Sequence, residues 1–224
     1  MTCVLVTRPQ SAADEFAINL KEKGLDVLFA PMLEYKEVSA DFSDVSNYDA
    51  LIFTSAQAAR VFAKNCPARE HVIFTVGNMT AKVAEALGFK NIYSADGNSD
   101  DLEKVIKEKV KDTKFLQLCS ADTPDSVFEK KVIYKAEFID DFPDNVVSAF
   151  QSGTINAVSL FSVRTAQNFI KLLENNKLDD VTGDIAVVCI SDTVAEEIKT
   201  FKWGKIYVAN NPNAGSLLEK LIAL

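Results

Sequence analysis

Residues 50–62 read ALIFTSAQAARVF, and residues 157–169 read AVSLFSVRTAQNF. Each stretch has an apolar run of strand length, a turn that contains Ser, and a following segment whose apolar residues recur at helical spacing. The first stretch can be laid over the second, so that Ser55 falls on Ser162 and Phe62 falls on Phe169. This match predicts that the chain holds two copies of one strand–turn–helix unit.

The repeat extends outward from both stretches. Residues 92–95 match residues 206–209, and residues 102–106 match residues 218–222. Short apolar runs alternate with amphipathic segments, which is typical of parallel sheets covered by helices on both faces. The sequence therefore predicts an α/β protein with two similar three-layer domains. Strands are expected near 3–6, 26–30, 50–53, 72–76, 92–93, 115–119, 131–139, 157–161, 185–190 and 206–209, and helices near 16–20, 56–64, 79–87, 99–109, 145–151, 163–175, 192–201 and 214–222.

The composition is that of an ordinary globular protein. The chain has 224 residues, of which 48% are apolar and 25% are charged, and its formal net charge is -8. An acidic chain lacks the general attraction to phosphate backbones on which nucleic-acid binders rely, so no nucleic-acid partner is expected. No basic, apolar leader opens the sequence and no apolar run reaches about 20 residues, so no membrane partner is expected. Four widely spaced cysteines favour free thiols, and the cytoplasm is the predicted compartment.

Small polar residues follow most of the predicted strands. In open parallel sheets, ligands bind at the carboxyl ends of the strands, where helix N-termini present backbone N–H groups. Each Ser, Thr or Asn at these turns could simply cap the helix that follows, which is the commoner role of such a residue. Their concentration at one edge of both repeats nevertheless suits the binding of an anionic ligand. The candidate ligand-binding residues are Thr7, Arg8, Thr54, Ser55, Gly77, Asn78, Thr80, Ser162, Arg164, Ser191 and Thr193.

Several common site types are missing from the sequence. It has no G-x-G-x-x-G after the first strand and no G-x-x-x-x-G-K-[ST], which argues against dinucleotide and P-loop nucleotide binding. Its single histidine, His71, stands at the start of an apolar strand, away from the predicted ligand edge. A Ser-His-Asp triad and a histidine metal site are therefore not expected. We expect no cofactor and no metal.

The order of short motifs resembles that of the uroporphyrinogen III synthase family. The motifs are V-T-R-P at 6–9, I-F-T-S at 52–55, V-G-N-x-T-A at 76–81, V-I-Y at 132–134, F-S at 161–162, C-I-S-x-x-x-A at 189–195 and W-G at 203–204. Each motif is short and common in α/β proteins. Their order, the duplication and the chain length agree with the family over essentially the whole sequence.

The resemblance implies a domain arrangement that the residue pattern alone leaves open. In this family the first unit of each repeat packs into the opposite domain, and the two flavodoxin-like domains are joined by a two-stranded linker. Carried over, residues 1–35 and 139–224 make one domain, residues 38–136 make the other, and the linkers lie at about 34–38 and 135–139. Sequence patterning would equally permit a simple tandem of two domains.

The resemblance also implies a reaction. The family cyclises the linear tetrapyrrole hydroxymethylbilane to uroporphyrinogen III, with inversion of the terminal pyrrole ring and loss of water, in a cleft between the domains and without a cofactor. Tyr134 falls on a tyrosine proposed as the proton donor to the leaving hydroxyl, although it could equally be a packed strand aromatic. Gln57 stands where many members carry a basic or amide residue, and Arg8 is a candidate cation for substrate carboxylates. Val194 replaces a family threonine, with Thr193 one position earlier.

The expected partner is therefore hydroxymethylbilane, bound by a monomer that makes at most transient contact with the preceding enzyme of the pathway. Two alternatives remain open at this point. One is a hinged two-domain protein that binds or senses a small molecule without catalysis. The other is a metal-free isomerase or lyase that acts on a different anionic substrate.

Overall fold

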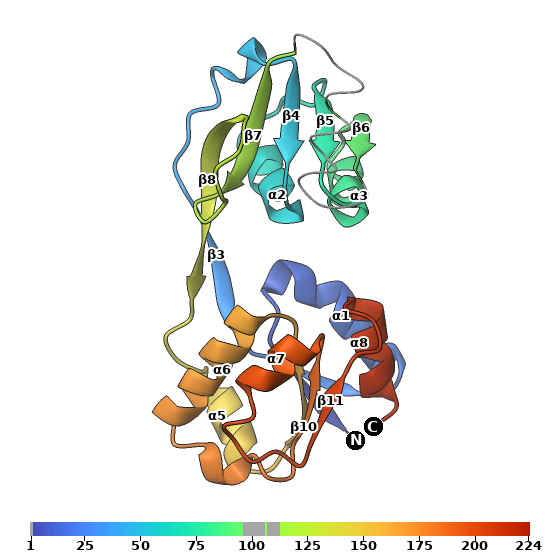
Figure 1. The fold of residues 1–224 in the computed structure, drawn as a ribbon, viewed down its shortest axis with the longest axis vertical. Coiled ribbons are helices and arrows are strands. Elements are labelled where there is room, and N and C mark those ends of the chain that lie inside the picture. Colours follow the sequence, from blue (N-terminus) through green and yellow to red (C-terminus); the bar gives the residue numbers. More distant parts are fainter. Residues whose placement is uncertain (1, 96–105, 107–112) are drawn as a thin grey trace. The chain divides into compact units, whose positions relative to one another are not determined.

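The computed structural model describes residues 2–95, 106 and 113–224. The chain divides into two compact units (Figure 1). Unit 1 comprises residues 1–34 and 137–224, and unit 2 comprises residues 35–136. The helix expected over residues 99–109 lies outside the described residues except for Ile106. None of the helices in the described residues has the length and apolar character needed to cross a bilayer.

Unit 1 is built on a five-stranded sheet with the order β11-β10-β9-β1-β2, and all of its neighbouring strands are parallel. Its strands are β1 (Cys3–Val6), β2 (Asp26–Phe29), β9 (Ile155–Leu160), β10 (Ala186–Cys189) and β11 (Lys205–Val208). Its helices are α1 (Gln10–Glu22), α5 (Asp144–Gln151), α6 (Val163–Asn175), α7 (Asp192–Glu197) and α8 (Ala214–Ile222), with a short 3₁₀ turn at Asp179–Val181.

Helices cover both faces of the unit 1 sheet. On one face, α1 and α8 pack through Phe16, Leu20 and Leu217 (Figure 1). On the other face, α5, α6 and α7 surround a larger core that includes Phe150 and Phe169. Strand side chains alternate between the two cores, and both faces are apolar because both are buried.

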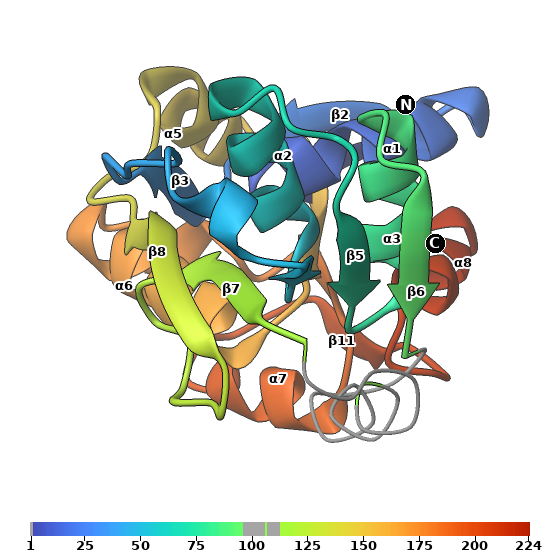
Figure 2. The ribbon, with the colours of Figure 1, turned by 90° about the horizontal axis from the view of Figure 1, so that it is seen from above.

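Unit 2 is built on a six-stranded sheet with the order β3-β8-β7-β4-β5-β6. Its strands are β3 (Leu33–Glu37), β4 (Ala50–Phe53), β5 (Val72–Thr75), β6 (Asn91–Ser94), β7 (Phe115–Ser120) and β8 (Glu129–Phe138), with helices α2 (Ala56–Asn65) and α3 (Asn78–Ala86) and a 3₁₀ turn at Val45–Asn47. Strands β4 to β8 are parallel, as Figure 2 shows for β5 and β6. The main core lies under α2 and α3, and Ile106 belongs to a smaller core with Ile52 and Phe74.

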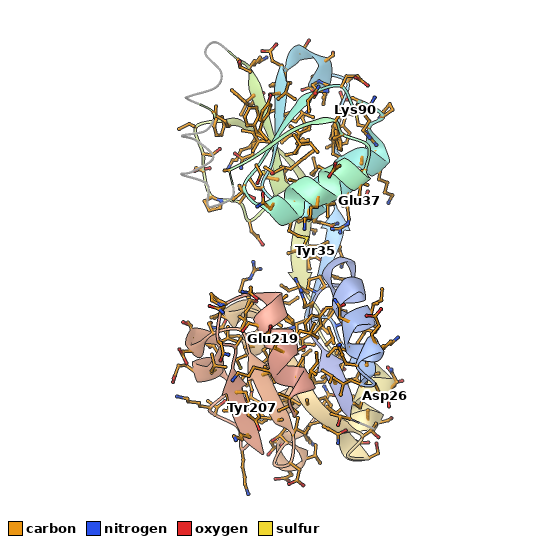
Figure 3. All side chains as sticks on the ribbon, turned by 90° about the vertical axis from the view of Figure 1, so that its right-hand side faces the viewer. Asp26, Tyr35, Glu37, Lys90, Tyr207 and Glu219 are labelled. Atoms are coloured by element: carbon orange, nitrogen blue, oxygen red, sulfur yellow. The ribbon has the colours of Figure 1, made fainter. Side chains whose placement is uncertain are left out.

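Strand β3 pairs with β8 in the opposite direction. The Val38 N–H donates to the Ile133 carbonyl, and the Ile139 N–H donates to the Met32 carbonyl, so the two strands are antiparallel. Tyr35 lies along β3, as Figure 3 shows. These two strands carry the chain from one unit to the other and back.

Both sheets have the same internal order, and this order explains the exchange between the halves of the chain. If β1 and β2 are strands one and two of unit 1, its sheet reads 2-1-3-4-5, which is the flavodoxin-like order. Unit 2 gives the same order when β7 and β8 are its first two strands. The opening strands of each sheet thus come from the opposite half of the sequence. The predicted α/β fold class, with flavodoxin-like sheets and exchanged first units, is confirmed.

One helix differs from the sequence-based expectation. Helix α7 ends at Glu197, whereas the pattern predicted a helix to residue 201. The indole N–H of Trp203 donates to the Ile198 carbonyl at 2.7 Å, so a side chain satisfies a carbonyl that a longer helix would bond internally. Residues 121–128, which connect β7 to β8, contain turns and bends. Lys130 holds this connection through Asp125 and the carbonyls of Thr123 and Pro124.

Candidate functional site

The topology of each sheet marks one place for a ligand. In open α/β sheets, ligands bind beyond the carboxyl ends of the strands, at the point where the strand order reverses. In unit 1 this point lies between β1 and β9, and in unit 2 it lies between β7 and β4. Some of the predicted site residues lie at these strand ends, and others follow β5 and β10. Each unit is described separately below.

A group of hydroxyls occupies the reversal point of unit 2. The Tyr134 phenol on β8 lies 2.9 Å from the Ser55 hydroxyl, which follows β4. Tyr134 is also the register partner of Ser120, at the end of β7. The Tyr35 ring packs against the Tyr134 ring edge-on, with centroids 5.5 Å apart. Side chains from the ends of β4 and β7 and from β3 therefore meet around the phenol that β8 carries.

A β-bulge aims Tyr134 at this group. The β7–β8 register runs from Leu116 opposite Glu129 to Cys119 opposite Val132, and then skips Ile133. Because side chains alternate along a strand, the skipped residue lets the consecutive Ile133 and Tyr134 both be buried. Bulges of this kind re-aim side chains and are frequent next to functional sites.

The surroundings keep the Tyr134 phenol protonated at neutral pH. Only 6% of the residue is exposed. Burial raises the pKa of the Tyr134 phenol above its ordinary value of 10.0, because a phenolate would lose its hydration. The Ser55 and Ser120 hydroxyls oppose this shift by hydrogen bonding. The net effect is a neutral proton donor held between two hydroxyls.

Ser55 has a second role as the N-cap of α2. Its hydroxyl accepts the Ala58 N–H at 3.1 Å, as the capping interpretation of these residues predicted. The same oxygen therefore links the first turn of α2 to the Tyr134 phenol. Thr54 and Gln57 lie half-buried on either side of this cap. The edge here carries neutral donors at the positive end of a helix dipole.

The other predicted turn of unit 2 joins β5 to α3. Gly77 is the N-cap of α3 and has no side chain to bond the helix. Asn78 and Met79 are exposed, and Met79 is 59% accessible, while Thr80 is buried against the sheet. The turn thus offers an amide, an apolar thioether and backbone N–H groups.

The reversal point of unit 1 is cationic. The Thr7 hydroxyl is fully buried and donates to the Ser159 carbonyl at 2.6 Å, which ties the end of β1 to β9. Arg8 follows, and its guanidinium carbon lies 4.5 Å from the centroid of the Phe161 ring. Arg164, in the first turn of α6, lies 5.2 Å from the centroid of the Phe138 ring. Two arginines at adjacent strand ends therefore each stack on an aromatic ring.

Ser162 and Ser191 begin the two helices that follow in unit 1. The Ser162 hydroxyl accepts the Thr165 N–H at 3.1 Å and lies 2.8 Å from the Thr165 hydroxyl. Ser191 is the N-cap of α7 but makes no side-chain capping bond. Thr193 is exposed, whereas Val194 is 2% accessible and belongs to the core. The position where the resemblance implies a threonine is therefore a buried apolar one, and the Thr193 side chain is exposed in the first turn of α7.

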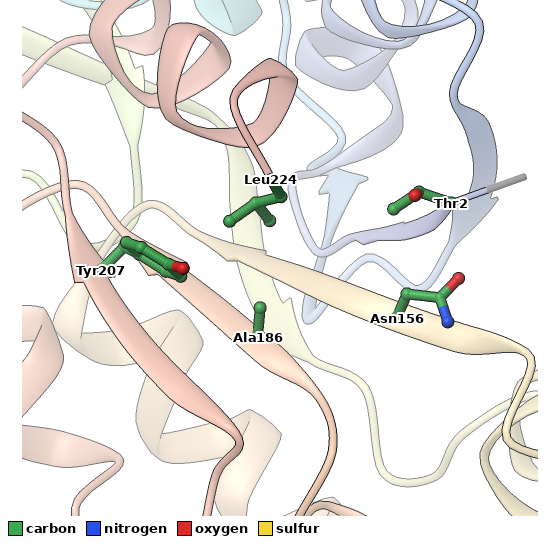
Figure 4. Close-up of a pocket in the computed structure, with 5 residues that line it drawn as sticks. All are labelled: Thr2, Asn156, Ala186, Tyr207 and Leu224. Atoms are coloured by element: carbon green, nitrogen blue, oxygen red, sulfur yellow. The ribbon is translucent and has the colours of Figure 1, made fainter.

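A hollow lies at the opposite edge of the unit 1 sheet. It measures about 460 Å³ and is open to solvent (Figure 4). Thr2 precedes β1, Asn156 and Ala186 lie near the amino ends of β9 and β10, and Tyr207 of β11 and Leu224 complete the lining. His71, as expected, precedes β5 at the amino edge of unit 2, with its Nε2 3.2 Å from the Val45 carbonyl oxygen. Within the described residues, no three His, Cys, Asp or Glu side chains gather as metal ligands would.

Three residues that the sequence analysis did not propose belong to these edges. Ser120 ended a predicted strand, but no sequence signal paired it with Tyr134. Tyr35 lay in a predicted linker, and only the pairing of β3 with β8 brings it to the phenol. For Phe161 a signal existed: in the internal repeat it falls on Thr54, so the second copy has a ring where the first has a hydroxyl.

Comparisons with known proteins point to one family. The family described as Uroporphyrinogen-III synthase HemD matches residues 14–219. An uncharacterised protein of Rickettsia prowazekii is 23% identical over an alignment of 259 residues, which covers 94% of each chain. A uroporphyrinogen-III synthase of Synechococcus elongatus is 24% identical over 213 residues, which covers 84% of this chain and 81% of the relative.

The same family name attaches to a solved structure. The crystal structure of uroporphyrinogen-III synthetase from Helicobacter pylori 26695 matches 100% of this chain and 99% of its own, with a TM-score of 0.66 and 16% sequence identity. At that identity the likeness shows a shared fold. The family match, by contrast, spans most of the sequence, and it confirms the resemblance drawn from the motifs. The chain belongs to the uroporphyrinogen-III synthase family.

Proposed function

We propose that this protein is a uroporphyrinogen-III synthase, a lyase that cyclises hydroxymethylbilane to uroporphyrinogen III with inversion of the terminal pyrrole ring and loss of water. The observation that carries the proposal is the Tyr134–Ser55 hydroxyl pair at the reversal point of unit 2. Family membership supports the same reaction. The substrate would engage the carboxyl edge of each unit.

Tyr134 would supply the proton for the first step. An electron-rich pyrrole can expel its hydroxymethyl oxygen when that oxygen is protonated. The C–O bond breaks, the phenolic proton leaves with the oxygen as water, and the pyrrole nitrogen stabilises the cation that remains. Since burial raises the pKa of Tyr134, the phenol is a weak acid and must donate as the C–O bond breaks. Ser55 and Ser120 would stabilise the charge that develops on the phenol oxygen.

The second task is to choose the carbon that is attacked. Without guidance, the substrate closes to isomer I. Attack at the substituted carbon of the terminal ring gives a spiro intermediate and then isomer III, so the enzyme must mainly control geometry. Neutral donors at Thr54, Gln57 and Asn78, together with the helix N-termini, can hold the acetate and propionate groups of the substrate. Arg8 and Arg164 would add charged contacts.

The test is product analysis. Hydroxymethylbilane, made by its own synthase, is incubated with and without the purified protein, and uroporphyrinogen isomers I and III are separated after oxidation. We expect isomer III to dominate with the protein and isomer I to dominate without it. Equal isomer mixtures in both samples would reject the proposal in favour of a binding protein or an enzyme for another anionic substrate.

A further inference from the structure

Phe161 stands out at the carboxyl edge of unit 1 because it interrupts a row of polar residues. It follows β9 directly and precedes the N-cap Ser162. The internal repeat aligns it with Thr54, which holds the same place beside Ser55 in unit 2. The second copy therefore has a bulky ring at the reversal point where the first copy has a hydroxyl.

Two side chains contact the Phe161 ring. Phe16 of α1 packs edge-on against Phe161, with centroids 5.1 Å apart and planes at 86°. The guanidinium of Arg8 lies over the ring at 4.5 Å. Phe16 is 4% exposed and belongs to the core between α1, α8 and the sheet. A continuous set of contacts thus runs from the core, through Phe161, to a cation at the edge.

We propose that Phe161 is a positioning residue that holds the Arg8 guanidinium in place for a carboxylate of the substrate. This inference rests on the proposed function, because it takes the tetrapyrrole acid as the ligand. It also assigns the cationic contact to unit 1 and the proton donor to unit 2. The turns after β4 and β5 support this division, since residues 54–59 and 75–81 contain no charged side chain.

The chemistry of the stack explains why a ring would serve better than a hydroxyl. An aromatic face attracts a guanidinium without using its N–H groups, which all lie in the guanidinium plane. Those groups keep the fork geometry that suits a carboxylate. Arginine also loses considerable rotamer freedom on binding a ligand, and a side chain already held on a ring loses less. The Thr7 hydroxyl adds to this order by tying the preceding residue to β9.

The test is steady-state kinetics on a double-mutant cycle of Phe161→Leu and Arg8→Gln. Loss of the ring should raise KM about threefold to tenfold, with kcat changed less than about twofold, because a ground-state contact is weakened. Phe161→Tyr keeps the face of the ring and should restore a KM near that of the wild type. In the Arg8→Gln background, Phe161→Leu should have no further effect on KM. Phe201→Leu makes the same change against Trp203, away from this edge, and should leave KM unaltered.

Several outcomes would overturn the inference. These are an equal rise in KM with and without Arg8, a fall in kcat at constant KM, and a Phe161→Leu protein with unchanged kinetics. If Phe161→Leu does not fold, Phe161→Met fills a similar volume and can still pack on Phe16, so the same comparisons apply. A wild-type chain that makes no isomer III would reject the proposed function and this inference with it, whereas an active wild type with an additive cycle would reject the inference alone.

Discussion

Replacing Tyr134 by Phe separates the chemical role of the phenol from its packing. The variant keeps the ring, its edge-on contact with Tyr35 and the filled core, and it loses the 2.9 Å hydrogen bond to Ser55. One such bond contributes about 1 kcal/mol net to folding. The Ser55 hydroxyl still caps α2, so the helix should remain intact. A fall of roughly 2–8 °C in Tm is expected for a unit of this size.

The effect on catalysis should be larger. A positioned general acid contributes about 10²–10⁴-fold, and the raised pKa of the phenol makes it a weak acid, so a loss of about tenfold to a hundredfold is expected. Slower turnover gives the substrate time to close unaided. The share of isomer I should therefore rise in proportion to the loss of rate.

The assay measures initial rate, isomer ratio and thermal unfolding on the same preparations. Tyr207→Phe is the matched control, because it removes a phenol from the hollow at the amino edge of unit 1 (Figure 4) and should change neither rate nor ratio. An unchanged rate and ratio in Tyr134→Phe, with only the loss of stability, would refute the acid role and leave Tyr134 as a packed strand aromatic.

Three further predictions concern stability and pH. Arg69 donates hydrogen bonds to four carbonyls near the ends of α2 and α3, those of Ala63, Cys66, Ala68 and Leu87. Arg69→Met should therefore lower the free energy of unfolding in urea by about 1–3 kcal/mol. Arg69→Lys should not restore that stability, because one ammonium cannot reach all four carbonyls. Buried Asn168 of α6 donates to the carbonyls of Met32 and Ile139 at 3.1 Å, so Asn168→Leu should cost a similar amount. The control is Asn175→Leu, at an exposed position of the same helix. The Glu129 hydrogen bond, followed by burial, raises the pKa of Tyr48 to about 12. Tyr48 then loses its proton at lower pH in the unfolded chain than in the folded one, so the urea midpoint should fall between pH 10 and pH 12. Tyr48→Phe should make this fall shallower. An equally steep fall of the midpoint in the variant would contradict the assignment.

Periodicity and repetition were enough to predict the layers of this fold. Apolar runs such as residues 50–53 and 157–160 are buried on both faces of their sheets. Because both faces are buried, strands of parallel sheets can be recognised in a sequence as nearly continuous apolar runs. The exchange of first strands could not be predicted from the hydrophobic pattern, because a strand has the same pattern whichever sheet it joins. It came from the family resemblance, and the strand order then confirmed it.

The sequence predicted that the site lies at the carboxyl ends of the strands, but it did not predict which side chains contact one another there. Ser55 and Ser162 could be found because N-cap residues follow strands at a regular place in the repeat. The pairing of Tyr134 with Ser55 depends on a bulge at Ile133, and this bulge was not predicted from the sequence. Arg8 and Phe161 are far apart in the sequence, so their contact could be found only in the structure.

The central claim is that the tetrapyrrole is held at the carboxyl edges of the two sheets. Amide hydrogen exchange with and without uroporphyrinogen III, kept reduced, tests it most directly. We predict added protection in peptides that contain residues 54–58, 77–81 and 161–165, whose N–H groups begin α2, α3 and α6. Protection confined to the amino edge, around Asn156 and Tyr207, would contradict the account.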